Sequence, residues 1–210
     1  MVWLDQGRPS VASSPGWRCF QLGLFLLPSS ALLGSLLLFP ALLYGSFGRD
    51  RPYWRDLWNA PLLMSAALMI LGCFQAHDKG LAWVGLGNWI PFFWGFWGFQ
   101  PYVMSREARR RCALWLVAGT VPVVVTGLGQ LWWGWQGPWQ LLGGLIVWFM
   151  AAGGRPEGRL SGLFDYANIA SAWLALVWPL TLAALVQQGL TRWRRCVVIL
   201  LAVLVVLALV

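Results

Sequence analysis

The sequence predicts an all-α protein, a polytopic bundle of five to six transmembrane helices. Of its 210 residues, 59% are hydrophobic and only 10% are charged, whereas soluble domains carry about 25% charged residues. The charges stand in short clusters between long uncharged stretches, and the 17 tryptophans suit the boundary between hydrocarbon and lipid headgroups. So few charges cannot cover a surface in water, which excludes a soluble enzyme and a disordered chain.

The first uncharged stretch, residues 20–47, leaves two arrangements open. Its 28 residues are long for one helix and short for two full spans, and Pro28 lies near its start. One spanning helix would put the N-terminus outside the cell, whereas a short hairpin broken at Pro28 would put it inside. Residues 1–18 lack the basic start and the adjoining apolar core of a signal peptide.

Five further helices are expected from the later stretches, because about 20 apolar residues cross the hydrocarbon of a bilayer. Pro61 lies in the first turn of its helix, where its missing N–H does no harm, and Pro122 interrupts the third of the five. We expect these helices at residues 57–76, 81–104, 113–131, 168–188 and 195–210. No sheet is expected, because a backbone in lipid must satisfy its own hydrogen bonds.

A loop and interfacial segment is predicted at about residues 132–165. It begins with WWGWQGPW at 132–139, a turn-rich aromatic cluster typical of a membrane interface. Residues 140–150 are too few to cross, so we expect an interfacial or re-entrant segment packed on the bundle.

The basic residues predict which side each loop faces. The clusters at 49–55, 106–111 and 192–195 contain ten arginines, and the alternate loops at 77–79 and 155–159 contain three basic residues. Single spans between them place the first three clusters on one side, which is then cytoplasmic. The loop at 132–165 faces the periplasm of a multi-pass protein in the bacterial inner membrane. This topology accounts for the net charge of +8, so nucleic acid is not an expected partner.

We expect a single transmembrane domain over residues 1–210 that forms the N-terminal part of a longer polytopic protein. The expectation rests on the last 15 residues, 196–210, which are apolar to the end and too short to cross the bilayer. The four cysteines have no close pairing, so neither a metal site nor a disulfide framework is predicted, and no cofactor is expected.

The chemistry-bearing segment is GGRPEGRLSGLFDYAN at 153–168, just before a predicted helix start. Glycine allows a close backbone approach, a helix N-terminus presents unpaired N–H groups, and guanidinium makes paired bonds to phosphate oxygens. The segment is thus a candidate anion site. Arginines that only meet lipid headgroups, with Asp165 or Asn168 as a plain helix N-cap, are the alternative.

The segment RLSGLFDYANIA at 159–170 resembles the R-x-[ST]-G-x-F-x-N-P-N-x-x-A element of the bacterial O-antigen ligase/polymerase superfamily, in particular its cyanobacterial branch. QLWWGWQGP at 130–138 and PFFWGFW at 91–97 are also similar to that branch. Arg159, Gly162, Phe164 and Asn168 match the element and are the substrate-binding residues that the resemblance implies. Tyr166 and Ala167 stand where the family has Asn-Pro.

The resemblance implies a metal-free glycosyltransferase that moves a glycan from an undecaprenyl-diphosphate carrier to an acceptor at the periplasmic face. The family's arginines hold the carrier diphosphate, and its histidine, in a later periplasmic loop, would lie beyond Val210. The catalytic residue is therefore unknown, and residues 1–210 alone are not expected to be active. His77 precedes the element and is interpreted as an interfacial loop residue.

Two other functions stay open. Part of the cyanobacterial branch is labelled as bicarbonate transporters, although no charged residue lies within a predicted span and no broken-helix repeat is evident. A non-catalytic membrane scaffold is the third possibility, with PFFWGFWGF at 91–99 as a helix-packing surface.

Overall fold

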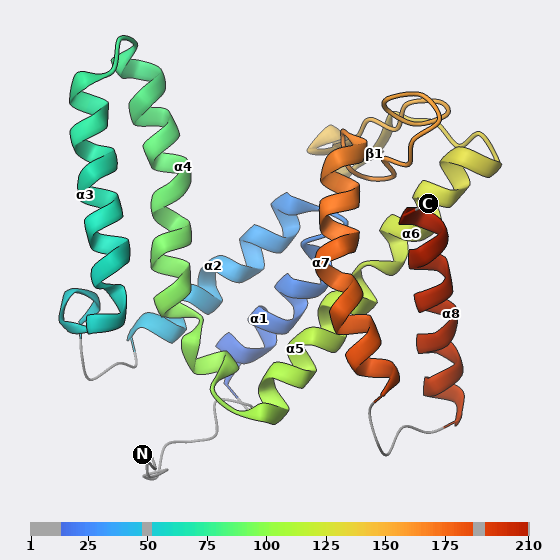
Figure 1. The fold of residues 1–210 in the computed structure, drawn as a ribbon, viewed down its shortest axis with the longest axis horizontal. Helices are drawn as coiled ribbons and strands as arrows, with labels where there is room; N and C mark the ends of the chain where they lie inside the picture. The colour runs from blue at the N-terminus through green and yellow to red at the C-terminus, as the bar shows by residue number, and fades with distance from the viewer. Residues whose placement is uncertain (1–13, 48–51, 187–191, 210) are drawn as a thin grey trace. The chain divides into compact units, whose positions relative to one another are not determined.

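The computed structural model describes residues 14–47, 52–186 and 192–209, and these are mostly helical (Figure 1). Within them, three helices are long and apolar enough to cross a membrane, at Leu57–Gln75, Arg106–Trp132 and Ala167–Leu185. The predicted mostly helical fold is confirmed, and three of the predicted five to six spans have a helix of suitable length and composition among the described residues. The chain forms two compact units, residues 1–20 with 39–108 and residues 21–38 with 109–210.

The first uncharged stretch forms two short helices, α1 (Pro15–Leu26) and α2 (Ala31–Phe47). Of the two arrangements left open by the sequence, the structure therefore has the hairpin broken near Pro28. Glycine lets the two helices approach closely, because a Cβ at Gly23 of α1 would lie 2.7 Å from the Leu38 side chain of α2.

Within the first unit, α3 (Ala60–Gln75) and α4 (Lys79–Gly98) form a helical hairpin (Figure 1). Its turn contains the exposed His77 and is fixed by Asp78, whose carboxylate accepts a hydrogen bond from the Leu81 N–H at 3.0 Å. This is an ordinary N-cap for α4. Pro61 lies in the first turn of α3, as predicted.

The single helix predicted at residues 81–104 is wrong at its C-terminal end. The α-helix stops at Gly98, and a 3₁₀ turn (Gln100–Val103) follows, because Pro101 has no N–H to continue the α-helical hydrogen bonds. Tyr102 in this turn is buried, and its hydroxyl donates to the Ala41 carbonyl at 2.8 Å.

Helices α5 (Arg106–Gly119), most of which belongs to the second unit, and α6 (Val121–Trp132) form one long segment with a break at Thr120, next to Pro122 as expected. The predicted basic loop at 106–111 is instead the start of α5. Helices α7 (Ala167–Leu185) and α8 (Arg192–Leu209) run antiparallel beside it (Figure 1). Gln188 and Val210, the predicted last residues of these two helices, lie outside the described residues.

The core of the second unit joins α5, α6, α7 and α8 with one loop residue, Leu160. Aliphatic side chains at helical spacing meet there, as they do in a packed bundle. Its buried members are Val117, Val124, Leu128, Leu160, Ala170, Leu174, Val177, Leu201, Val205 and Ala208.

The expectation of no sheet is wrong at one place. β1 (Trp139–Leu141) and β2 (Ile146–Trp148) pair antiparallel, with Trp139 opposite Trp148. The chain reverses at Gly143 and Gly144, which have φ of +65° and +92°, a conformation that glycine adopts at no steric cost. The predicted interfacial segment is thus a β-hairpin (residues 139–148, here "the hairpin").

Candidate anion site at the start of helix α7

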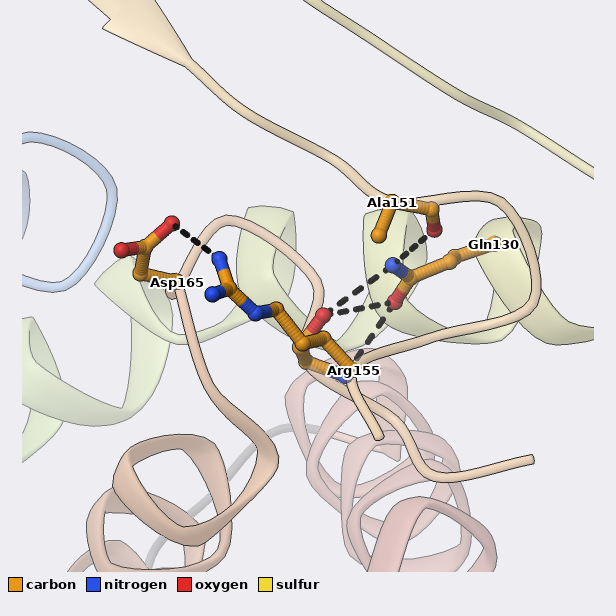
Figure 2. Close-up of polar contacts among 5 residues, drawn as sticks. Gln130, Ala151, Arg155 and Asp165 are labelled. Carbon is orange, nitrogen blue, oxygen red and sulfur yellow. Dashed lines mark hydrogen bonds and ion pairs between the residues drawn. The ribbon is translucent and has the colours of Figure 1, made fainter. Parts of the chain in front are cut away.

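A buried glutamine of α6 holds the loop that precedes α7. The Gln130 side chain is 0% exposed, and its Oε1 accepts hydrogen bonds from the Ser161 N–H at 3.1 Å and the Gly162 N–H at 2.9 Å. Its Nε2 donates to the Ala151 carbonyl at 2.7 Å and to the Ser161 hydroxyl at 3.0 Å (Figure 2). One amide therefore fixes both ends of residues 151–162. We call residues 151–166 "the arm".

Two glycines allow the arm to lie directly on α6. Gly162 has φ of +56°, and a Cβ there would lie 2.9 Å from the Val123 carbonyl oxygen. A Cβ at Gly127 of α6 would lie 2.6 Å from the Leu160 side chain. Only glycine provides both the backbone conformation and the space at position 162.

Two apolar side chains attach the arm to the core. Leu160 is buried in it, and the half-buried Phe164 packs against it, 6.3 Å from the ring of Trp173 of α7. Gly162 and Phe164, both predicted as substrate-binding, therefore face the protein. Their positions in the structure suit a role in holding the arm in place.

The other two predicted residues lie together at the surface. Arg159 and Asn168 are both exposed, and the Arg159 guanidinium donates to the Asn168 side-chain oxygen at 3.2 Å. Asn168 lies in the first turn of α7. The structure thus places the Arg159 charge at a helix N-terminus, where the helix dipole favours an anion.

The α7 N-terminus differs in part from the expectation. Tyr166 is the N-cap residue and makes no side-chain capping bond, so neither Asp165 nor Asn168 has that role. The Ala167 N–H is already bonded to the Arg155 carbonyl at 2.9 Å. Not every N–H of this terminus is open to a ligand, and the arm itself caps one of them.

The arm contains two arginines and two acidic residues, and one arginine is paired with one of the acids. The Arg155 guanidinium lies 3.9 Å from the Asp165 carboxylate, and both side chains are exposed (Figure 2). Arg159 instead faces the neutral amide of Asn168. Because an amide does not neutralise a cation, the charge of Arg159 is available to an anionic ligand.

The arm lies at one end of the second unit, and the arginines of α5 and α8 lie at the other. Helix α7 begins beside the arm and runs to the end where α8 starts with Arg192 (Figure 1). Within this unit, the arrangement agrees with the predicted opposite placement of the two sets of basic residues.

Sequence reasoning missed Gln130 as a site residue. The available signal was a glutamine inside the otherwise apolar stretch 113–131, because a polar side chain within a span needs a partner in the protein. Among the described residues, no three His, Cys, Asp or Glu side chains gather as a metal site would require.

Comparisons of the chain with protein-family models, with curated proteins and with solved structures give no match.

Proposed function

We propose that this chain belongs to a membrane glycosyltransferase of the O-antigen ligase/polymerase type, with five to six spans in the bacterial inner membrane. In this proposal, the protein moves a glycan from an undecaprenyl-diphosphate carrier to an acceptor at the periplasmic face. The reaction class rests on the resemblance of residues 159–170 to the family element, and the carrier site rests on the geometry of the arm.

The observation that carries the site is the exposed guanidinium of Arg159 at the N-terminus of α7, on an arm fixed by a buried glutamine. A fixed cation loses less conformational entropy on binding than one on a mobile loop. Guanidinium also presents its donors in a planar fork that matches two phosphate oxygens.

The same arrangement suits the chemistry of transfer. The diphosphate is the leaving group, and its negative charge grows as the bond to the sugar breaks. A guanidinium and a helix N-terminus that already face this position stabilise the growing charge without reorganisation. Asn168 would then accept from Arg159 and hold its orientation.

Binding of undecaprenyl diphosphate to the chain in lipid nanodiscs tests this site. Arg159→Ala should weaken binding roughly 10- to 100-fold, since a hydrogen bond to a charged group contributes about 1.5–3 kcal/mol. Arg159→Lys keeps the charge but loses the paired geometry, so its effect should lie between wild type and Arg159→Ala.

Two matched controls give the measurement its specificity. Arg195→Ala removes an exposed arginine at the start of α8, at the end of the second unit away from the arm, and should leave binding unchanged. Arg155→Lys should be tolerated better than Arg159→Lys, because Arg155 already faces Asp165. Equal affinity of wild type and Arg159→Ala would remove the carrier site from the proposal and leave Arg159 as a headgroup contact.

A further inference from the structure

The hairpin presents an apolar surface that the described part of the protein does not cover. Its tip (residues 142–145) carries Leu142 at 62% and Leu145 at 66% exposure, and Phe149, just after β2, is 67% exposed. Four tryptophans precede or open the hairpin and are also exposed: Trp132, Trp133, Trp135 and Trp139.

The sequence divides the loop between α6 and α7 into two chemically different parts. Residues 132–154 contain no charged side chain, and all four charges of the loop lie in the arm, on Arg155, Glu157, Arg159 and Asp165. A water-facing loop of this length with no charge and outward leucines is unfavourable, whereas indole and leucine side chains are typical of the bilayer interface.

Hydrogen bonds hold the hairpin together and fix it to the rest of the second unit. Its strands pair with each other, and its base is fixed because the Gly137 N–H donates to the Met150 carbonyl at 2.9 Å. Trp148 also anchors it, since the indole Nε1 donates to the Ser29 carbonyl at 2.6 Å. Both strands also have an open edge, whose polar backbone groups need headgroups or water, so a hairpin of this kind suits the interfacial region.

One residue of the tip, Leu142, has an unfavourable backbone conformation. Leu142 has φ of +53°, a region that favours glycine and that β-carbon-bearing residues rarely adopt. A leucine kept in this conformation with most of its side chain exposed gains little from packing inside the protein. Strained residues cluster at functional sites, which motivates a role for this side chain.

We propose that the hairpin inserts its tip into the interfacial region of the lipid bilayer and sets the depth of the adjoining arm. Helices α6 and α7, which border this loop, each belong to a candidate span, so the loop begins and ends at a membrane surface. The Leu142 and Leu145 side chains reach the boundary of the acyl chains, the tryptophans lie at headgroup level, and the charged arm stays in water. This inference does not depend on the proposed glycan transfer.

Nitroxide labels in phosphatidylcholine vesicles test the insertion. Single cysteines would replace Leu145, the exposed Glu157 of the arm and the exposed Leu68 of α3, in a chain whose four native cysteines are replaced. The ratio of oxygen to water-soluble nickel-complex accessibility at Leu145→Cys should be at least about threefold that at Glu157→Cys, because oxygen concentrates in hydrocarbon. It should lie between the ratios at Glu157→Cys and Leu68→Cys, because Leu68 lies near the middle of a candidate span. Equal ratios at Leu145→Cys and Glu157→Cys would overturn the proposal.

A second measurement keeps the native cysteines, since Cys73 and Cys112 are buried and their replacement can impair folding. A photo-activatable diazirine amino acid at position 145 should add the mass of one phospholipid after irradiation in the same vesicles. A crosslink to a second copy of the chain would show that protein covers the tip, and a product modified only by water would show that it is solvated. Either result would overturn the proposal.

Discussion

Replacing Gln130 by leucine is the sharpest test of how the arm is held. Leucine keeps much of the volume but removes the acceptor of the Ser161 and Gly162 N–H groups and the donor to the Ala151 carbonyl. Each hydrogen bond contributes a net 0.5–1.5 kcal/mol, so the three backbone contacts together contribute about 3 kcal/mol. The freed groups can turn to water, so we expect local opening of the arm with the helices intact.

Hydrogen–deuterium exchange in nanodiscs measures this opening directly. A loss of about 3 kcal/mol corresponds to roughly 100-fold faster exchange at the Ser161 and Gly162 amides, with little change in α7 and α8. Gln136→Leu is the matched control, because Gln136 is exposed on the same loop. The reasoning is refuted if Gln130→Leu leaves the exchange of the arm unchanged, or if Gln136→Leu accelerates it equally.

Further predictions concern stability, topology and pH. Gly162→Ala should destabilise the chain by about 2 kcal/mol or more in thermal unfolding, since it adds a contact at 2.9 Å to an unfavourable φ. Gly158→Ala, at φ of +79° with open space around it, should cost only about 1 kcal/mol. Reporter fusions at Arg109 and Arg194 should report the cytoplasm and a fusion at Gly154 the exterior, and one shared compartment for Arg109 and Gly154 would contradict the topology. Burial raises the pKa of Tyr53, whose hydroxyl donates to the Phe93 carbonyl at 3.3 Å. The folded state favours the neutral phenol, so the contribution of Tyr53 to the free energy of unfolding is complete below the ordinary pKa of tyrosine. That contribution is lost as the pH rises through the raised pKa. Tyr53→Phe should therefore reduce the loss of stability that urea unfolding measures at alkaline pH.

The sequence predicted the helical parts of the fold well, because their signals are local. An uncharged stretch of about 20 residues is a helix candidate wherever it occurs, and proline marks its breaks. The observed α3, α7 and α8 therefore begin and end within a few residues of their predicted bounds. The hairpin was missed because its strands are three residues long, which is too short for an alternation of polar and apolar side chains to be recognised.

For the candidate site too, the sequence motif predicted which residues are involved, and the structure showed which of them lie together. The motif at 159–170 identified Arg159 and Asn168, which the structure brings together through a hydrogen bond between residues nine positions apart. It also included Gly162 and Phe164, whose surroundings show that they attach the arm to α6 and the core. Motif matching gives the residues of a site but does not separate those that face a ligand from those that support the loop.

The sequence by itself determined the mostly helical fold with long apolar helices, the positions of most helices and the segment that carries the candidate chemistry. Composition and the spacing of charges determine these properties, because the cost of charge in lipid acts on each residue separately. Only the tertiary structure decided that Gln130 fixes the arm and that Trp148 anchors the hairpin to Ser29, at separations of 31 and 119 residues. Such pairs depend on which buried donor and acceptor meet after the helices have packed. Packing geometry sets those partners, because a polar group buried without one costs free energy that no local preference supplies.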